Sequence, residues 1–381
     1  MVEWKKLGEI GKCMAGATPS TKESSYWDNG TIPWMSSGEV HQGVVKSTSA
    51  LITQKGYDNS STKMLPSGTV VIALAGQGKT RGTVAITAIE LCTNQSLCGV
   101  VIDKDSIINK YVYYYLKTRY DDLRRISSGE GTRGGLNLEM IGSYLIPVPS
   151  LSEQERIVGI LDTFTSSIEN LKEQIAQRRK QYEYYRDQLL DLEGKEGVEN
   201  KNLGDIVSFR NGKGHEKSIS ETGKYIVVNS KFISSTGEVI KYSNEQLCPL
   251  YVDDILMVMS DLPNGKALAK CFIVDSDDKY TLNQRIGAFH VLDQSILKSK
   301  YLYYKLNRNI QLLKFDNGID QTNLRKGDIL SILIPVPSIS KQQRIVSILD
   351  TFEASIQNLE AQLAQREKQY EYYRNKLLTF E

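Results

Sequence analysis

IPVPSLSEQERIVGILDTFTSSIENLKEQIAQRRKQYEYYRDQLL, at residues 146–190, decides the fold of this chain because it occurs twice. Residues 334–378 read IPVPSISKQQRIVSILDTFEASIQNLEAQLAQREKQYEYYRNKLL, and 32 of the 45 aligned positions are identical without a gap. The two copies lie about 188 residues apart, whereas solenoid repeats recur every 20 to 50 residues or so. The sequence therefore predicts a duplicated pair of domains, each followed by the same segment.

Each copy is predicted to be a long helix. The prolines of IPVP favour an extended approach to it. Ser152 stands three residues before Glu155, and Ser340 three before Gln343, which is the spacing of a capping box at a helix start.

The apolar residues of each helix form a stripe that is typical of a coiled-coil seam, because they alternate four and three positions apart. Only Arg178 and Arg366 interrupt the stripe, as snorkelling side chains or as polar residues that set the register. A helix with one apolar face needs a partner in water, so the two copies are expected to pair, antiparallel if the domains lie at opposite ends. The seam residues are Ile157, Leu161, Phe164, Ile168, Leu171, Ile175, Tyr182, Tyr185 and Leu189, with Ile345, Leu349, Phe352, Ile356, Leu359, Leu363, Tyr370, Tyr373 and Leu377 in the second copy.

The segments upstream of the helices diverge but keep matching landmarks, among them Asn94-Gln95 and Asn283-Gln284. Strand-like runs alternate with helical ones, which indicates the α+β class. Strands are predicted at residues 69–74, 82–86, 224–228 and 254–259, helices near 109–122 and 298–313, and a charged linker at 191–202.

Composition excludes several classes of protein. Hydrophobic residues make up 40% and charged residues 24% of the 381 residues, which rules out global disorder. The sequence has neither an apolar run of membrane-spanning length nor a signal-like N-terminus, so a cytoplasmic protein is expected. Five cysteines without a CxxC pair and three scattered histidines argue against a disulfide framework and a bound metal. The net charge of +2 does not by itself mark a nucleic-acid binder.

Residues 73–80, ALAGQGKT, resemble a loose P-loop in which alanine replaces the first glycine. A true P-loop leads into a helix, whereas a β-like run follows here, so a hairpin turn is expected. The functional alternative is a glycine-rich loop that presents Lys79, Thr80 and Arg81 to a DNA groove, with Lys266 in a comparable turn of the second half.

Further polar loops place Arg133, Arg285 and Arg325 among glycine, asparagine and glutamine. Arginine and lysine can read guanine, and asparagine and glutamine can read adenine, in the major groove. We expect these three arginines to contact DNA, and the alternative for each is an ordinary solvated surface residue.

Off the seam, the helix surface repeats as faithfully as the seam itself, although packing within the pair does not require it. Lys180 and Arg186 recur as Lys368 and Arg374. These four residues are predicted to bind two copies of one partner. We find no set of catalytic residues: an amino-methyltransferase needs an [ND]PP[FY]-type loop, and the chain has no Pro-Pro dipeptide.

Over its whole length the chain resembles the DNA-specificity (S) subunits of Type I restriction-modification systems. The marks are the two LIPVPSxSxQxRIVxILD stretches at residues 145–162 and 333–350, the QYEYYR helices after them, and near the start Gly16-Ala-Thr-Pro19-Ser20-Thr21 and Ile32-Pro33-Trp34. The second half has Phe209-Arg-Asn-Gly-Lys-Gly in place of the GxTPS stretch, so its domain is expected to read a different sequence.

The resemblance implies two α/β target recognition domains, at residues 1–150 and 193–337. Two long helices that are conserved in the family, at 151–192 and 338–381, separate them and form an antiparallel coiled coil with internal pseudo-two-fold symmetry. It also implies a non-catalytic subunit that reads a bipartite target in double-stranded DNA. Two modification subunits would dock on the helices and restriction subunits would join the complex, with S-adenosylmethionine, ATP and Mg²⁺ on those partners and no membrane involved.

Two other functions are compatible with the sequence. One is a coiled-coil scaffold or dimerisation protein with no DNA role. The other is a specificity unit fused to a methyltransferase, which the missing cofactor motif disfavours.

Overall fold

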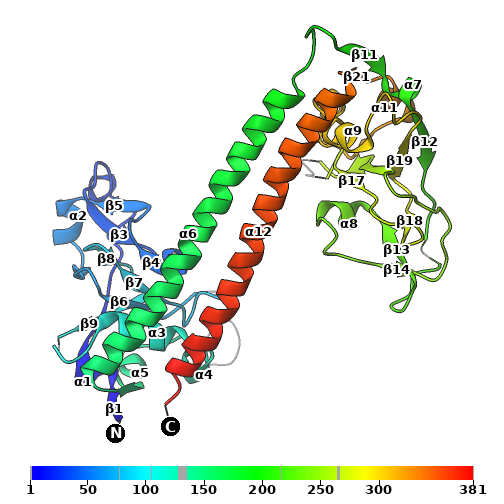
Figure 1. Cartoon of the computed structure of the whole chain (residues 1–381). Helices are drawn as coiled ribbons and strands as arrows, with labels where there is room; N and C mark the ends of the chain where they lie inside the picture. Colours follow the sequence, from blue (N-terminus) through cyan, green and yellow to red (C-terminus); the bar gives the residue numbers. More distant parts are fainter. Residues whose placement is uncertain are drawn as a thin grey trace. The chain divides into compact units, whose positions relative to one another are not determined.

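The structure is a computed structural model that describes residues 2–76, 78–103, 105–127, 135–215, 217–263 and 267–380. It divides into two compact units, residues 1–172 with 361–381 (unit 1) and residues 173–360 (unit 2). Two long helices, α6 (Leu151–Leu190) and α12 (Ile339–Leu377), each cross the boundary between the units (Figure 1). Each unit therefore holds one α/β domain, the first part of the helix that follows it and the last part of the other helix.

Unit 1 is built on a five-stranded sheet and a three-stranded sheet. The larger sheet has the order β2 (Gly11–Ala15), β9 (Leu97–Ile102), β6 (Val70–Ala73), β7 (Val84–Thr87), β4 (Val44–Val45). The smaller is β5 (Ala50–Ile52), β3 (Ile32–Met35), β8 (Cys92–Thr93). Its short helices are α1 (Leu7–Ile10), α2 (Gln54–Asp58), α3 (Asn109–Lys117), α4 (Tyr120–Ile126) and α5 (Leu138–Gly142), with 3-10 turns at Ser24–Tyr26 and Ser37–Gln42.

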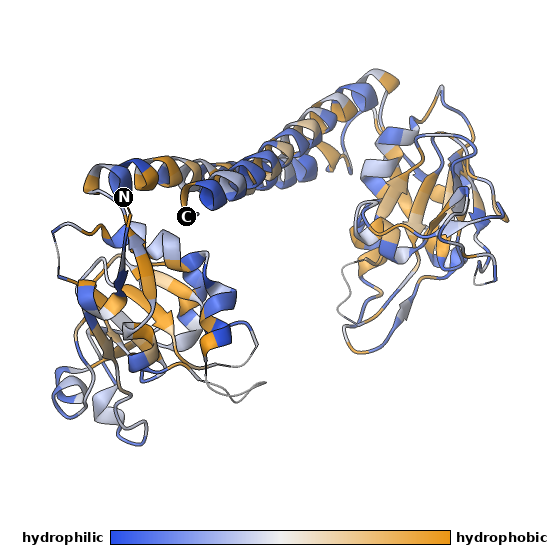
Figure 2. Ribbon diagram, turned by 90° about the horizontal axis from the view of Figure 1, so that it is seen from below, coloured by the Kyte–Doolittle hydropathy of each residue, from blue (hydrophilic) through white to orange (hydrophobic). Residues whose placement is uncertain are grey.

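Unit 2 repeats this plan with a four-stranded and a three-stranded sheet, and Figure 2 shows the hydrophobic residues of both domains gathered on their strands. The orders are β12 (Val207–Asn211), β19 (Ile286–Val291), β15 (Ile255–Val258), β17 (Cys271–Ile273), and β14 (Tyr242–Ser243), β13 (Tyr225–Val228), β18 (Tyr280–Leu282). A two-stranded ribbon joins β16 (Ser260–Asp261) to β20 (Thr322–Asn323). The helices are α7 (Leu203–Ile206), α8 (Ser230–Ser234), α9 (Ser299–Leu306), α10 (Ile310–Leu313) and α11 (Lys326–Leu330).

The α+β prediction is confirmed, and the four predicted strands are β6, β7, β13 and β15. The two predicted domain helices are each interrupted, between α3 and α4 and between α9 and α10. At Thr118 the hydroxyl donates to the carbonyl of Tyr115, which competes with continuation of the helix. The predicted linker is wrong in its last part, because Glu199–Asn202 form strand β11.

An edge ribbon joins the start of each domain to its IPVP segment. Strand β1 (Glu3–Lys6) pairs antiparallel with β10 (Leu145–Val148), with Trp4 opposite Pro147. Strand β11 pairs in the same way with β21 (Leu333–Val336), with Asn200 opposite Pro335. Proline is tolerated here because two-stranded ribbons leave one side of each strand unpaired. Both ends of a domain thus meet where its long helix begins.

The capping prediction is wrong by two residues in each helix. The backbone amide of Glu153 donates to the carbonyl of Ser150 at 3.0 Å and approaches its hydroxyl at 3.4 Å, and the amide of Lys341 approaches the hydroxyl of Ser338 at 3.4 Å. Ser150 and Ser338 follow the last proline of IPVP directly and stand just before the first helical residues, Leu151 and Ile339. Ser152 and Ser340 lie inside the first turn.

A fully buried glutamine anchors each long helix to its domain. The Gln154 amide donates to the carbonyls of Ser106 and Pro149, each at 3.0 Å, and its oxygen accepts from the amide of Ile108. Gln342 makes the same three bonds in unit 2, to the carbonyls of Ile296 and Pro337 and from the amide of Lys298. Each side chain satisfies three backbone groups at the junction of its domain and helix, and its bond to the proline carbonyl is fully buried.

Two tyrosines of each domain add to this anchor. The hydroxyls of Tyr111 and Tyr301 donate to the carbonyls of Pro147 and Pro335, both at 2.7 Å. Tyr114 donates to Asp162 of α6, and Tyr304 to Asp350 of α12. Burial and the neighbouring carboxylate raise the pKa of both tyrosines, so that they remain donors at neutral pH.

The far end of the other long helix docks on the same domain. In unit 1 the Arg119 guanidinium donates to the carbonyl of Leu378, and in unit 2 the Lys305 amine donates to the carbonyl of Leu190. Cations at these positions satisfy terminal carbonyls and complement the negative end of the helix dipole. Each domain therefore holds the start of one helix and the end of the other.

The helices are antiparallel within each unit, as predicted. In unit 1 the ring of Phe164 stacks on Tyr373, with centroids 5.4 Å apart, and in unit 2 Tyr185 stacks on Phe352 at 5.5 Å. Arg366 and Arg178, which interrupt the stripe, each lie over the phenylalanine of the partner helix. Their long side chains cover the seam from its edge, which is the snorkelling role. Ion pairs Lys172–Glu367 and Arg179–Glu360 flank the seams.

We expect Gln154→Ala to lower the stability of unit 1 by about 2 kcal/mol or more, because it removes three hydrogen bonds to backbone groups, one of them fully buried. Gln181→Ala, at an exposed position of the same helix, is the matched control. Chemical unfolding followed by hydrogen exchange would localise the loss to residues 105–165. Equal stability of the two variants would show that the buried amide does not anchor the helix.

Candidate nucleic-acid interface

The segment that resembles a P-loop is the turn of a hairpin, as expected from the strand that follows it. Strands β6 and β7 pair antiparallel, and the amide of Gly82 donates to the carbonyl of Ala73. Gly78 and Gly82 have positive φ angles of 63° and 81°, which glycine adopts without strain. No helix follows to bind a phosphate, so the geometry of a nucleotide site is absent from this described segment.

Lys79, Thr80 and Arg81 lie on this turn but differ in exposure. Lys79 is exposed, and its carbonyl accepts from the hydroxyl of Tyr120. The hydroxyl of Thr80 lies 3.2 Å from Nε2 of His41. Arg81 is only 5% exposed. Burial gives the Arg81 side chain a structural role in this conformation, and Lys79 is the residue of the three that faces solvent.

The same pair of backbone hydrogen bonds, which we call the backbone ladder, supports the loops of both domains. In unit 1 the amide of Leu74 donates to the carbonyl of Ser96, and the carbonyl of Leu74 accepts from Leu136. In unit 2 Met259 takes the place of Leu74. Its amide donates to the carbonyl of Arg285, and its carbonyl accepts from the amide of Leu324. Three loops that are far apart in sequence thus meet in each unit.

The ladder brings two predicted DNA-contacting residues together. Arg285, which is exposed with a φ of 71°, precedes β19, and exposed Arg325 directly precedes α11. The amine of Lys326 lies over the ring of Phe209, 5.5 Å from its centroid. We call the surface formed by these loops the rim of each domain. The rim of unit 2 therefore carries several cations. Arg133 and Lys266 lie outside the described residues.

Arg210, in strand β12, has a structural role. Its guanidinium donates to the carbonyl of Pro249 and forms an ion pair with Asp254, whose side chain is completely buried. His290 contacts the other oxygen of Asp254 at 2.9 Å, and the amide of Tyr251 donates to the same carboxylate. A buried carboxylate needs such partners because its transfer from water is costly.

The glycines near these loops approach the protein's own backbone. A Cβ on Gly16 would lie 1.8 Å from the carbonyl oxygen of Thr93, and one on Gly212 would lie 1.9 Å from that of Asn283. Glycine is therefore required at both positions for close packing within the domain.

The predicted partner-binding residues fall into two kinds. Lys180 and Lys368 are exposed on the helix surface. Arg186 and Arg374 are half-buried: each lies over the tyrosine four residues before it, Tyr182 or Tyr370, and bonds to the side chain of the next residue. The lysines are available to a partner, whereas the arginines also stabilise their own helix.

Sequence reasoning missed an exposed aromatic pair that occurs in both helices. Tyr184 and Tyr372 are each 59% exposed and make edge contacts with Tyr185 and Tyr373. The signal was present in the sequence, since Tyr184 and Tyr372 are identical in the repeat but lie off the seam. Exposed tyrosines of this kind are enriched in protein interfaces.

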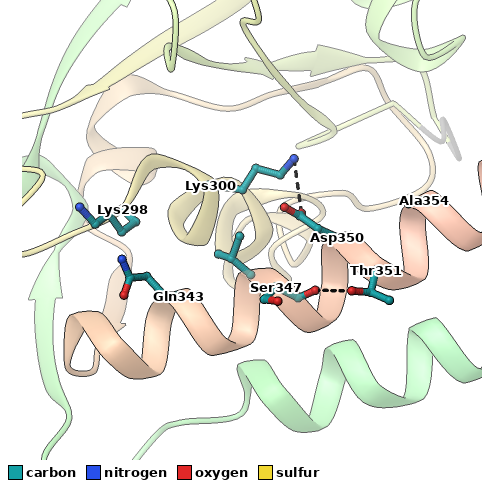
Figure 3. Close-up of a pocket in the computed structure, with 8 residues that line it drawn as sticks. Lys298, Lys300, Gln343, Ser347, Asp350, Thr351 and Ala354 are labelled. Carbon is teal, nitrogen blue, oxygen red and sulfur yellow. Dashed lines mark hydrogen bonds and ion pairs between the residues drawn. The ribbon is translucent and has the colours of Figure 1, made fainter.

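A recess of about 630 Å³ lies at the start of α12, between this helix and α9. Figure 3 shows the Lys300 amine directed at Asp350, 3.4 Å away, with Gln343 and Ser347 on the adjacent helical turns. Unit 1 has an equivalent recess in which Lys110 pairs with Asp162 at 2.7 Å. The junction of each domain with its helix is therefore a second repeated surface feature.

We expect Asp254→Ala to destabilise unit 2 by about 1–3 kcal/mol, because it leaves the amide of Tyr251 and the guanidinium of Arg210, which is 41% exposed, without their carboxylate partner. Glu221→Ala, at an exposed carboxylate of the same unit, serves as the control. Denaturant unfolding would measure both variants. A loss below about 1 kcal/mol for Asp254→Ala would contradict a structural role for this ion pair.

Among the described residues, no group of three or more histidine, cysteine, aspartate or glutamate side chains is placed to hold a metal ion. The described helices also include none with the length and apolar character needed to span a membrane.

Curated proteins with sequences similar to this chain include specificity subunits of Type I restriction enzymes. The Type I restriction enzyme EcoR124I/EcoR124II specificity subunit of Escherichia coli is 38% identical over 206 residues, which are 52% of this chain and 50% of that protein. The chain thus spans half of the length of this relative. The Type I restriction enzyme MjaIX specificity subunit of Methanocaldococcus jannaschii is 28% identical over 389 residues, covering 93% and 87% of the two chains.

Solved structures share the fold. The crystal structure of a Type I restriction-modification S subunit from M. genitalium covers 100% of this chain and 97% of its own, with a TM-score of 0.64 and 17% identity. The family profile described as Type I restriction modification DNA specificity domain matches twice, at residues 1–178 and 195–367. The chain belongs to this family and is a specificity subunit of a Type I restriction-modification system.

Proposed function

We propose that the chain reads a bipartite target in double-stranded DNA, one half-site with each domain, and does no chemistry itself. The observation that carries the proposal is the shared backbone ladder with different side chains on it. Ser96 stands where unit 2 has Arg285, and Asn137, after Leu136, stands where unit 2 has Arg325. One scaffold with two sets of exposed polar groups suits two different sequences, because base edges are read by side chains.

Exposed Lys79, Arg285 and Arg325 remain our candidates for DNA contact, with Thr80 beside Lys79 on the same turn. Arg133 and Lys266 remain candidates from sequence. The long helices would set the number of unread base pairs between the half-sites. A helix of 40 residues is about 60 Å long, comparable to roughly 18 base pairs at 3.4 Å each.

The repeated helix surface would bind two modification subunits, and restriction subunits would join through that complex. S-adenosylmethionine, ATP and Mg²⁺ would then be bound by those partners. Two observations support recruitment at this surface: Tyr184 and Tyr372 are equally exposed, and Lys180 and Lys368 flank them on the same helices. A structural neighbour with a TM-score of 0.61 and 16% identity comes from work on complex assembly and conformational transition of the type I R-M system.

Recruitment is tested with the variant Lys180→Glu, Tyr184→Ala, Lys368→Glu, Tyr372→Ala. Loss of exposed aromatic anchors and reversal of two charges should weaken binding of modification subunits by at least tenfold, since such anchors are frequent hot spots. The control is Arg186→Lys with Arg374→Lys, which keeps the charge at the half-buried positions. Calorimetric titration with modification subunits measures both; unchanged affinity of the fourfold variant would place the docking site elsewhere.

Bipartite reading is tested by exchange of residues 1–150 for the corresponding part of another specificity subunit. Because each half-site is assigned to one domain, the exchange should alter one half of the target selected from a random duplex pool. The other half and the spacer should remain. A change in both halves would defeat the assignment, and failure of the parent protein to select any duplex would favour a scaffold without a DNA role.

A further inference from the structure

Asn94-Gln95 and Asn283-Gln284 occupy the same structural position in the two domains. Met35 pairs with Thr93 at the end of β3, and Val228 pairs with Leu282 at the end of β13, both in parallel register. The amides of Asn94 and Asn283 then donate to the carbonyls of Met35 and Val228. The dipeptide therefore follows the same strand pair in each unit.

The asparagine is accounted for by the turn it makes. Besides the bond from its amide, the carbonyl of Asn94 accepts from Leu97, and that of Asn283 accepts from Ile286. The side chain of Asn94 also accepts from the amide of Ser96, as asparagine commonly does in turns. A structural reason for the same residue in both domains is thus present.

The glutamine that follows the asparagine is the second residue that the two turns share. Gln95 and Gln284 are both exposed, between strands that are buried. Their neighbours differ between the domains, since Ser96 corresponds to Arg285. An exposed side chain that is the same on two otherwise different rims points to a contact that both rims share.

The Gln95 amide is held in a fixed orientation. The hydroxyl of Thr18 donates to its Oε1 at 2.6 Å. The loop that carries Thr18 is itself held by two indoles, because Trp34 donates to the carbonyl of Ala17 and Trp27 to that of Ser20. These two rings pack edge to face with centroids 5.1 Å apart. A side chain that is ordered in advance loses less entropy on binding.

We infer that Gln95 and Gln284 each read an A·T base pair at the same position of the two half-sites. The inference rests on the proposed reading of a bipartite target. Two different half-sites share only their sugar-phosphate backbone and any base pair common to both. A carboxamide donates and accepts at once, which matches N7 and N6 of adenine in the major groove, whereas a phosphate only accepts hydrogen bonds and would use the donor of the carboxamide alone.

Thr18 is then a positioning residue for half-site 1. In unit 2, Gly214 stands at the place that matches Thr18, two residues after Gly212. Backbone hydrogen bonds hold the second turn. The amide of Gln284 donates to the carbonyl of Lys213, and the amide of Lys213 donates to the carbonyl of Leu282.

The test selects duplexes from a randomised pool with the full chain and its modification subunits. The parent protein should select a target in which both half-sites contain an A·T pair at the corresponding position. Gln95→Ala should relax that pair in half-site 1 by about tenfold, and Gln284→Ala should relax it in half-site 2. Gln95→Glu, which keeps the shape but loses the donor, should turn the preference away from adenine.

Thr18→Val should weaken discrimination at the same pair, and Thr18→Ser should restore it, which a general loss of stability would not do. Gln54→Ala, at an exposed glutamine of α2, is the matched control and should select the parental target. A bipartite target without the shared A·T pair, or glutamine variants with parental selectivity, would overturn the inference and leave the proposed function intact. Reduced binding of modification subunits with unchanged selectivity would also overturn it. If the parent selects no bipartite target, both proposals fail together.

Discussion

The structure depends on the buried carboxamide that ties each domain to the first turn of its long helix. Gln154 and Gln342 both lie at the centre of an apolar junction and satisfy three backbone groups that belong to two segments. Such a bond set is directional, whereas apolar packing alone tolerates rotation of the helix against the sheet. The amide therefore fixes the direction in which the helix leaves the domain. Because each long helix leaves its domain in the same direction, the helices can make equivalent contacts in both units.

The repeat made the helices and their antiparallel pairing predictable, because a seam of this kind can be satisfied by its own second copy. The helix start was harder to predict, since Ser150 and Ser152 both satisfy simple capping patterns, and the structure places the cap at Ser150 through the amide of Glu153. The two interruptions of the domain helices depend on local competition for carbonyls, as at Thr118. Such competition does not change the spacing of apolar residues from which the helices were predicted.

The candidate interface was less predictable than the fold. Arg81 and Lys79 are two residues apart on one turn, yet one is buried and the other exposed. Arg210 is bound to a buried aspartate that lies 44 positions away in the chain. Tertiary contacts of this kind separate structural from exposed arginines, and sequence alone does not contain them. The ladder through Leu74 and Met259 could not be seen either, because backbone hydrogen bonds impose no residue type on the positions that make them.

Because these backbone hydrogen bonds do not depend on residue type, the two domains could diverge while the helices stayed alike. A rim built on backbone bonds accepts new side chains without loss of its supports, since the groups that hold it are present in every residue. The helix seams lack this freedom, because each aromatic contact needs both rings. Where the repeats do differ, contacts are lost: the Tyr182 hydroxyl donates to Glu353, but Thr165 stands at the corresponding place in the first repeat. The buried Tyr370 hydroxyl accordingly has no hydrogen-bond partner among the described residues. A single difference in the repeated segment thus leaves a polar atom unsatisfied, which is a physical reason for such segments to change together or not at all.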